Sequence, residues 1–199
     1  MLNKEIKKGI SILSKKDPIF KKLCENKTIT LEIEKNYFKS ITKSIIWQQV
    51  SWKSANTIYK KFLELFEKFP EPERILKIPD EKLKQAGLSF QKIKYLKDAA
   101  KKFANEELKI KEYNIMSNKD IINDLIKIKG VGKWTAEMFL IFSLGKLNVL
   151  PTSDLGIRKA IMKHYSLKTL PNKEKLKEFN KKWNPYNTIA SLILWQSKD

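Results

Sequence analysis

The spacing of apolar residues predicts a mainly helical protein. Three central segments each carry one apolar stripe at intervals of three and four residues, the spacing of a helix face. These stripes are Phe38, Ile41 and Ile45; Ile58, Phe62 and Leu65; and Ile93, Leu96, Ala100 and Phe103. Only residues 28–33 alternate like a strand, and a single short strand is marginal without partners, so we expect an extended connector there.

Helix start signals agree with this pattern. Asp17-Pro18 and Asn184-Pro185 each place a capping side chain before a proline, which suits the first position of a helix. Ser89, Asn118 and Asn172 are further candidate caps.

The pattern also suggests two lobes. We expect a central helical lobe at 39–139 that ends in a helix-hairpin-helix, and a second lobe in which residues 1–38 pack with 140–199. Proline-containing stretches at 69–72 and 79–89 punctuate the middle without forming a flexible linker. A cleft between the lobes would then hold the active site.

The charge balance points to a polyanionic partner. The 199 residues include 41 Lys and Arg against 22 Asp and Glu, a net charge of +19, far beyond what solubility requires. Nucleic acid, an anionic membrane surface and acidic proteins all fit such a charge. The longest apolar runs, 138–142 and 192–195, are too short to span a bilayer, and residues 1–16 lack the pattern of a secretion signal. We therefore expect a cytoplasmic, nucleoid-associated or nuclear protein.

Cysteine usage narrows the chemistry. Cys24 is the single cysteine, which excludes an internal disulfide, a four-cysteine zinc site and a four-cysteine iron–sulfur cluster. We interpret Cys24 as a structural residue.

The stretch Lys129-Gly130-Val131-Gly132-Lys133 predicts a tight hairpin between two helices. Its glycines permit positive φ and close approach of a ligand, and the following helix start offers N–H groups and a positive dipole end, which suits a phosphate. Lys127, Lys129 and Lys133 add positive charge, and we expect Val131 to turn into the core. A dinucleotide fingerprint fits poorly because position 135 is threonine and no strand precedes. A plain helix–turn–helix connection remains open.

With Pro151-Thr152-Ser153-Asp154-Leu155-Gly156-Ile157-Arg158 following the hairpin, residues 125–158 resemble the helix-hairpin-helix DNA glycosylase superfamily. Three further stretches are most similar to its alkylpurine branch, the 3-methyladenine DNA glycosylase II type. They are Ser44-Ile45-Ile46-Trp47-Gln48-Gln49-Val50-Ser51, Gly87-Leu88-Ser89-Phe90-Gln91-Lys92, and Trp183-Asn184-Pro185-Tyr186 leading to Trp195. The resemblance covers about 44–196.

The resemblance implies an all-α, two-lobed fold in which Asp154 is the catalytic aspartate. It implies that Gln49, with Gln48 beside it, fills the gap left by a flipped nucleotide. It also implies that the backbone carbonyls of Ile126, Ile128 and Val131 could bind a monovalent cation, Na⁺ or K⁺, that bridges the hairpin to DNA phosphate.

Other implied features concern the reaction type and the pocket. The position of the Schiff-base lysine in lyase-type relatives is Trp134 here, which favours a monofunctional enzyme. Met138 stands where some relatives carry a pocket aromatic.

Residue chemistry adds roles and leaves alternatives open. Losing a purine builds positive charge on the sugar, which the Asp154 carboxylate would stabilise, although an N-terminal helix cap explains an aspartate there equally well. Indole faces attract a cationic methylated purine, so Trp134 and Trp195 could line the base pocket or simply pack. Arg158 is a candidate phosphate ligand, or a solvated residue.

The remaining tryptophans and the histidine receive structural roles. We expect Trp47, Trp52 and Trp183 in the core, and His164 at the surface.

Together these features predict an enzyme that excises alkylated purines, 3-methyladenine and 7-methylguanine, from damaged double-stranded DNA, acting as a monomer without an organic cofactor. The alternatives are a non-catalytic helix-hairpin-helix DNA-binding module, in which Asp154 is only a cap, and a bifunctional glycosylase and lyase.

Overall fold

The computed structural model describes residues 2–25 and 28–197, and every regular element in these ranges is helical, so the all-α prediction is confirmed. Residues 28–36 form no regular structure, in agreement with the expected connector. Within the described ranges, no helix combines the length and the apolar character that crossing a bilayer demands. The chain divides into two compact units, Met1–Ile33 with Leu140–Asp199, and Glu34–Phe139.

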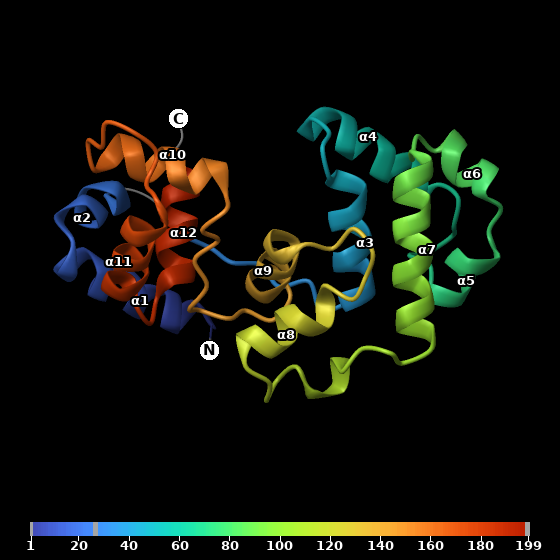
Figure 1. Ribbon diagram of the computed structural model, residues 1–199, viewed down its shortest axis with the longest axis horizontal. Helices are drawn as coiled ribbons and strands as arrows, with labels where there is room; N and C mark the ends of the chain where they lie inside the picture. The colour runs from blue at the N-terminus through green and yellow to red at the C-terminus, as the bar shows by residue number, and fades with distance from the viewer. Residues whose placement is uncertain (1, 26–27, 198–199) are drawn as a thin grey trace. The chain divides into compact units, whose positions relative to one another are not determined.

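The unit built from both chain ends is organised around its last helix. Its helices are α1 (Leu2–Lys16), α2 (Pro18–Cys24), α10 (Leu155–His164), α11 (Lys173–Trp183) and α12 (Asn187–Gln196). Helix α12 packs against the other four (Figure 1), and all its residues from Asn187 to Leu194 are buried. Its sequence is apolar on every side, which is typical of a helix at the centre of a core.

The Glu34–Phe139 unit is organised around its longest helix. Its elements are α3 (Tyr37–Trp47), α4 (Trp52–Leu63), α5 (Pro72–Lys77), α6 (Asp80–Gln85), α7 (Phe90–Ala104), the 3-10 turn η1 (Ile110–Glu112) and α8 (Asn118–Leu125). Helix α9 (Lys133–Phe142) also begins there. Helix α7 packs against α3 on one side and against α5 and α6 on the other (Figure 1), burying Ile93, Leu96 and Ala100 of its predicted stripe.

Most predicted helix starts are confirmed. Asp17 caps α2 with Pro18 at the first helical position, and Ser89 and Asn172 cap α7 and α11 through hydrogen bonds from backbone N–H groups. The predicted cap at Asn118 is wrong by one residue, because the Ser117 side chain accepts the capping hydrogen bond.

The prediction of a helix start at Asn184-Pro185 is wrong. Asn184 follows the last residue of α11, the Asn184–Pro185 peptide is cis, and α12 begins at Asn187. Asparagine and proline favour turns as much as helix starts, and here they form the turn between two helices.

The core prediction holds for Trp183 and fails for Trp52. Trp183 is completely buried and packs against the rings of Phe20 and Phe179. Trp47 is half-buried, whereas Trp52 is 73% exposed. Trp52 is the first residue of α4, one turn before Ala55, the first buried residue of that helix. Helix side chains tilt toward the N-terminus, so a side chain at the first position points away from the packed turns.

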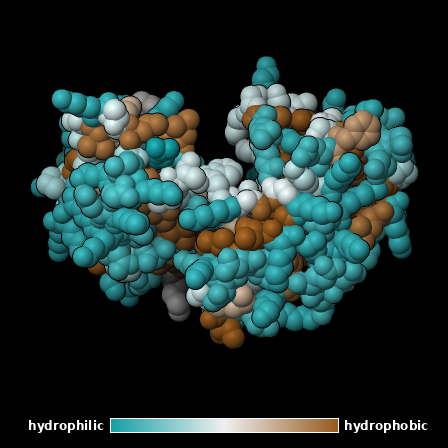
Figure 2. All heavy atoms as spheres, in the orientation of Figure 1, coloured by the Kyte–Doolittle hydropathy of each residue, from teal (hydrophilic) through white to brown (hydrophobic). Residues whose placement is uncertain are grey.

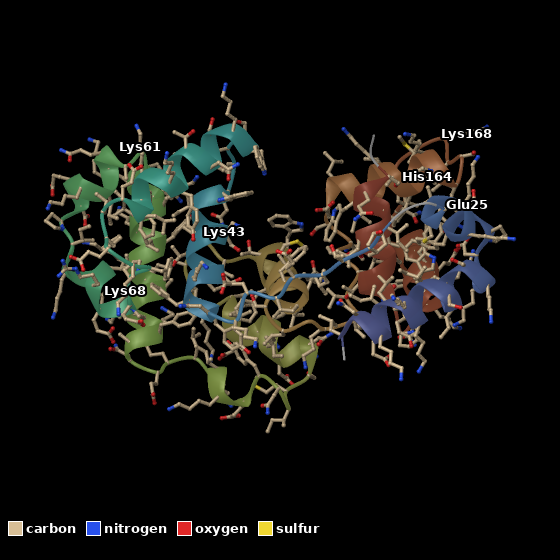
Figure 3. The ribbon with its side chains drawn as sticks, turned by 180° about the vertical axis from the view of Figure 1, so that it is seen from behind. Glu25, Lys43, Lys61, Lys68, His164 and Lys168 are labelled. Atoms are coloured by element: carbon tan, nitrogen blue, oxygen red, sulfur yellow. The ribbon has the colours of Figure 1, made fainter. Side chains whose placement is uncertain are left out.

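The surface of the visible face is dominated by hydrophilic side chains, with smaller apolar patches between them (Figure 2). Lysines account for much of this, and several lie on helix faces turned away from the core, such as Lys61 of α4 (Figure 3). The +19 charge is therefore displayed to solvent and available to an anionic partner.

Candidate DNA-binding and catalytic site

The predicted hairpin joins α8 to α9 and is closed by its own backbone. The Val131 N–H donates to the Ile128 carbonyl at 3.0 Å, and both side chains are buried, as predicted for Val131. The first hydrogen bond of α9 runs from the Ala136 N–H to the Gly132 carbonyl, so the helix begins directly at the second glycine. The start of α9 thus presents N–H groups beside the hairpin, as a phosphate site requires.

The two glycines of the hairpin, which both permit positive φ, have different roles. Gly130 has a φ of +79°, and a Cβ there would lie 2.1 Å from the Tyr95 ring. Gly132 has no positive φ, and a Cβ there would meet nothing within 4 Å. Gly130 is therefore required by the fold of the hairpin. At Gly132 the fold leaves open space next to the backbone.

Side chains of helix α7 contact the hairpin and hold its backbone. The Asp98 carboxylate accepts a hydrogen bond from the Lys129 N–H at 2.8 Å and pairs with Lys102 at 3.0 Å. Tyr95 lies against Gly130, and Gln91 hydrogen-bonds to the Tyr95 hydroxyl. Sequence reasoning missed Tyr95 and Asp98, because nothing local marks a residue whose partner lies about thirty positions away.

The predicted Gln48–Gln49 pair lies at the turn between α3 and α4. The Gln48 side-chain amide donates to the Gly130 carbonyl at 2.8 Å, so the structure brings this motif and the hairpin together. Gln49 is exposed and has a φ of +54°. Lys92 donates to the Ile46 carbonyl at 2.6 Å, and burial lowers the pKa of its ammonium group.

The charged residues around the hairpin differ in how far they are neutralised. Lys129 is exposed, and the Lys133 ammonium lies 3.7 Å from Glu137. Lys127 pairs with the buried Asp124 at 2.6 Å. Burial alone would raise the pKa of Asp124, but hydrogen bonds from Lys127, the Lys109 N–H and the Tyr113 hydroxyl lower it overall.

Two predicted pocket residues lie on α9. Trp134 is 43% exposed, which rules out the core alternative for this side chain, and Met138 is half-buried one turn further along the helix. Their contact with a base stays a prediction.

In the other unit, Asp154 is held at the start of α10. Its Oδ1 accepts hydrogen bonds from the Ile157 N–H at 2.8 Å and from the Trp195 indole Nε1 at 3.2 Å. The capping role weighed for Asp154 is therefore confirmed. A carboxylate has two oxygens, so capping through Oδ1 orients the group without consuming its charge.

Contacts with α12 and Phe142 hold the loop before Asp154 and the Trp195 indole beside it. The Asp154 N–H donates to the Pro151 carbonyl at 3.0 Å, and the preceding loop is bound to α12 through Thr188, whose hydroxyl accepts from the Val149 N–H at 3.0 Å. The half-buried Trp195 stacks on Phe142 with ring centroids 6.0 Å apart and an interplanar angle of 26°. Phe142 is a neighbour that the sequence did not suggest.

Two other residues have structural partners. Arg158 is half-buried and donates from Nη2 to the Pro171 carbonyl at 3.2 Å, so a phosphate contact through its remaining N–H groups stays a prediction. His164, at the end of α10 (Figure 3), is half-buried and shares a 2.8 Å hydrogen bond with Ser197.

The described residues contain no group of three or more His, Cys, Asp or Glu side chains that could hold a metal ion.

Comparison with known proteins adds the family to this geometry. Residues 42–185 match the model of the HhH-GPD superfamily of base excision DNA repair proteins. The chain belongs to this superfamily. The matched range contains the Gln48–Gln49 turn, the hairpin and Asp154, and it ends before Tyr186 and Trp195. The predicted resemblance to this superfamily is therefore confirmed.

Relatives from bacteria and yeast share most of the chain. YfjP of Bacillus subtilis, named provisionally as a DNA-3-methyladenine glycosylase, is 33% identical over 174 residues, covering 84% of this chain but only 61% of that protein. The alkylbase DNA glycosidase-like protein mag2 of Schizosaccharomyces pombe is 32% identical over 173 residues, covering 85% of this chain and 81% of its own length.

A solved structure extends the likeness to three dimensions. The 3-methyladenine DNA glycosylase Mag1 of Schizosaccharomyces pombe, in complex with abasic DNA, superposes with a TM-score of 0.85 at 31% identity. The match covers 95% of each chain.

Proposed function

We propose that this chain is a monofunctional DNA glycosylase that releases alkylated purines, 3-methyladenine and 7-methylguanine, from double-stranded DNA. The observation that carries the proposal is Asp154, whose carboxylate Oδ1 is fixed by the Ile157 N–H at the start of α10 and by the Trp195 indole N–H. A carboxylate oriented in this way can stabilise positive charge that develops beside it.

The chemistry follows from the substrate's own charge. The bond between the sugar C1′ and the purine nitrogen breaks, and its electron pair leaves with the base, which neutralises the positive charge of the alkylated ring. Positive charge then develops on the sugar. Asp154 stabilises this charged sugar more strongly than it stabilises the neutral sugar of the bound substrate. Water forms the new bond to C1′ and loses a proton. Asp154 would orient this water or accept the proton.

Base recognition is assigned to the aromatic residues. A cationic purine is attracted to an electron-rich indole face. Trp134 lies on α9, directly after the hairpin, and Trp195 donates its indole N–H to Asp154, so we assign both side chains to base recognition. Because the leaving base is already cationic, no strong general acid is needed to expel it. Trp134 in place of a nucleophilic lysine is the reason to expect hydrolysis without strand cleavage.

DNA binding is assigned to the hairpin and the Gln48–Gln49 turn. Lys129, Lys133 and the N–H groups at the start of α9 would bind phosphate, with Arg158 as a further contact, and Gln49 would fill the gap left by the flipped nucleotide. Backbone contacts of this kind position a protein without reading base sequence.

We include in the proposal a monovalent cation bound by the backbone carbonyls of Ile126, Ile128 and Val131. The Ile128 carbonyl accepts the Val131 N–H, and its second lone pair could contact such an ion. When bound, Na⁺ or K⁺ would add positive charge next to a phosphate.

The test is incubation of the protein with a duplex that carries one 7-methylguanine. We expect free 7-methylguanine and an intact strand with an abasic site, which breaks only after alkaline treatment. Tight DNA binding without base release would favour the non-catalytic module. Strand cleavage without alkali, together with an adduct trapped by borohydride, would favour the lyase.

A further inference from the structure

The turn that carries Gln49 also carries exposed apolar side chains that have no role among the proposed DNA contacts. Trp52 is 73% exposed and Val50 is 36% exposed, on either side of the α4 cap Ser51. Exposed large apolar side chains that cluster at one place are typical of surfaces that bind something. We call Val50 and Trp52 the α4 tip.

The α4 tip is fixed relative to the hairpin. Gln48 binds the Gly130 carbonyl at 2.8 Å on one side, and Ser51 accepts the Ser54 N–H at 3.2 Å on the other. The carbonyl of Ile46, at the end of α3, is held by Lys92. A ligand that binds the hairpin therefore meets a tip of defined position, and not a freely moving loop.

The surroundings of the tip indicate the occupant. Lys53 is exposed next to Trp52, and the Lys43 ammonium lies 4.9 Å from the centroid of the Trp47 ring, on the helix that leads to the turn (Figure 3). An exposed indole next to a lysine, on a turn that is hydrogen-bonded to the hairpin through Gln48, suits a ligand that combines aromatic faces with negative charge. A nucleobase on its phosphate backbone has both.

We propose that Trp52 stacks on a base of the duplex that is exposed when the damaged nucleotide leaves the helix. This inference rests on the proposed function and deepens it. Gln49 is polar and offers little stacking surface, whereas the adjacent indole offers a large rigid face. Trp52 is then a residue that stabilises the opened DNA, and it does not act on the reacting atoms.

The experiment compares two duplexes. One carries a stable abasic-site analogue, which already has an opened position, and the other is intact with the same sequence. Base stacking on an aromatic side chain is worth about 1–3 kcal/mol, so Trp52→Ala should weaken binding to the abasic duplex by roughly 5-fold to 150-fold. Binding to the intact duplex should change by less than about twofold, because phosphate contacts dominate it.

Two further variants act as controls. Trp52→Phe keeps an aromatic face and should retain most of the preference for the abasic duplex. Ile115→Ala removes a side chain that is 81% exposed in the segment between η1 and α8, at the opposite end of the same unit from α4 (Figure 1), and should bind both duplexes as the wild type does. Trp52 and Ile115 are both so exposed that substituting either should leave the fold intact.

A second readout reports stacking directly. With 2-aminopurine placed opposite the abasic position, wild-type protein should quench its fluorescence, and Trp52→Ala should quench less. Equal losses on both duplexes, no loss on either, or a wild type that does not prefer the abasic duplex would each overturn the inference.

These binding measurements need no catalysis, so they are separable from the proposed function. A wild type that prefers the abasic duplex through Trp52 but releases no base would refute the glycosylase and leave the role of Trp52 standing.

Discussion

At the scale of single residues, the hydrogen bond between Trp195 and Asp154 joins two roles that the sequence could only assign separately. The indole N–H donates to Oδ1 at 3.2 Å while the ring stacks on Phe142. Trp195 can therefore orient the carboxylate as well as offer a face to a cationic base, and two substitutions separate these effects.

Trp195→Phe should remove the hydrogen bond and keep an aromatic ring. We expect base release to slow by on the order of tenfold, equally for 7-methylguanine and for the neutral base hypoxanthine, because orientation of Asp154 affects both. Trp195→Leu should add a further loss of roughly two- to thirtyfold for 7-methylguanine alone, since it removes the cation–π contact. Single-turnover release from the two duplexes measures both effects, and equal losses for the two bases with Trp195→Leu would mean that Trp195 makes no cation–π contact with the base.

Single residues are also where the sequence predicted least. Trp52 was expected in the core because tryptophan is mostly buried, yet its position at the start of α4 turns it to solvent. Asp98 and Tyr95 support the hairpin through contacts between distant parts of the chain, which no local pattern reveals. Asp154 was singled out through the resemblance of residues 125–158 to a known superfamily, and its position as the cap of α10 was evident from residue types.

At the scale of elements, the hairpin shows what could be predicted and what needed coordinates. The glycine pair, the inward Val131 and the following helix were all evident from residue types. The difference between the glycines was not, because φ at Gly130 and the ring of Tyr95 beneath it are set by packing on α7.

The two glycines give a matched pair of variants. Gly130→Ala places a side chain in the left-handed region and against Tyr95, so we expect destabilisation of about 1–2 kcal/mol or more and weaker DNA binding. Gly132→Ala meets nothing, so the free energy of unfolding should stay within about 0.5 kcal/mol of the wild type.

Urea unfolding and duplex binding are measured for both variants. If Gly132→Ala binds DNA less well while remaining equally stable, the ligand approaches this glycine closely. Unchanged stability in Gly130→Ala would contradict the assigned role of the hairpin backbone.

At the scale of the whole molecule, one unit is assembled from both ends of the chain, and a buried carboxylate links them. Asp17 is 1% exposed, caps α2, and accepts hydrogen bonds from Tyr165 and from Trp183, with Lys182 paired at 2.9 Å. Burial alone would raise the pKa of Asp17, but Lys182, Tyr165 and the Ile19 N–H lower it overall.

This lowered pKa predicts acid sensitivity. The stabilisation from ionised Asp17 is fully present above its ordinary pKa of 3.8 and is lost as the pH falls through the lower folded-state pKa. Asp17→Asn should be less stable than the wild type at pH 7 by about 1.5–3 kcal/mol, because Tyr165 and Trp183 lose a charged acceptor and the part-exposed Lys182 loses its partner. The difference should shrink below about pH 4, where wild-type Asp17 also becomes neutral in the unfolded chain. Urea unfolding at pH 7 and at acidic pH measures it, and a difference independent of pH would contradict the assignment.

The central claim is that the Asp154 carboxylate drives base release and is more than a cap. Single-turnover release of 7-methylguanine from a duplex, compared between wild type and Asp154→Asn, tests it most directly. An amide oxygen can still accept the Ile157 N–H, so the variant should keep its stability and its DNA affinity. Because the amide carries no charge to balance the cationic sugar, we expect base release to fall by at least about a hundredfold.

Asp154→Ala, which also loses the cap, should be less stable by about 1 kcal/mol and equally inactive. Full base release by folded Asp154→Asn would contradict the account.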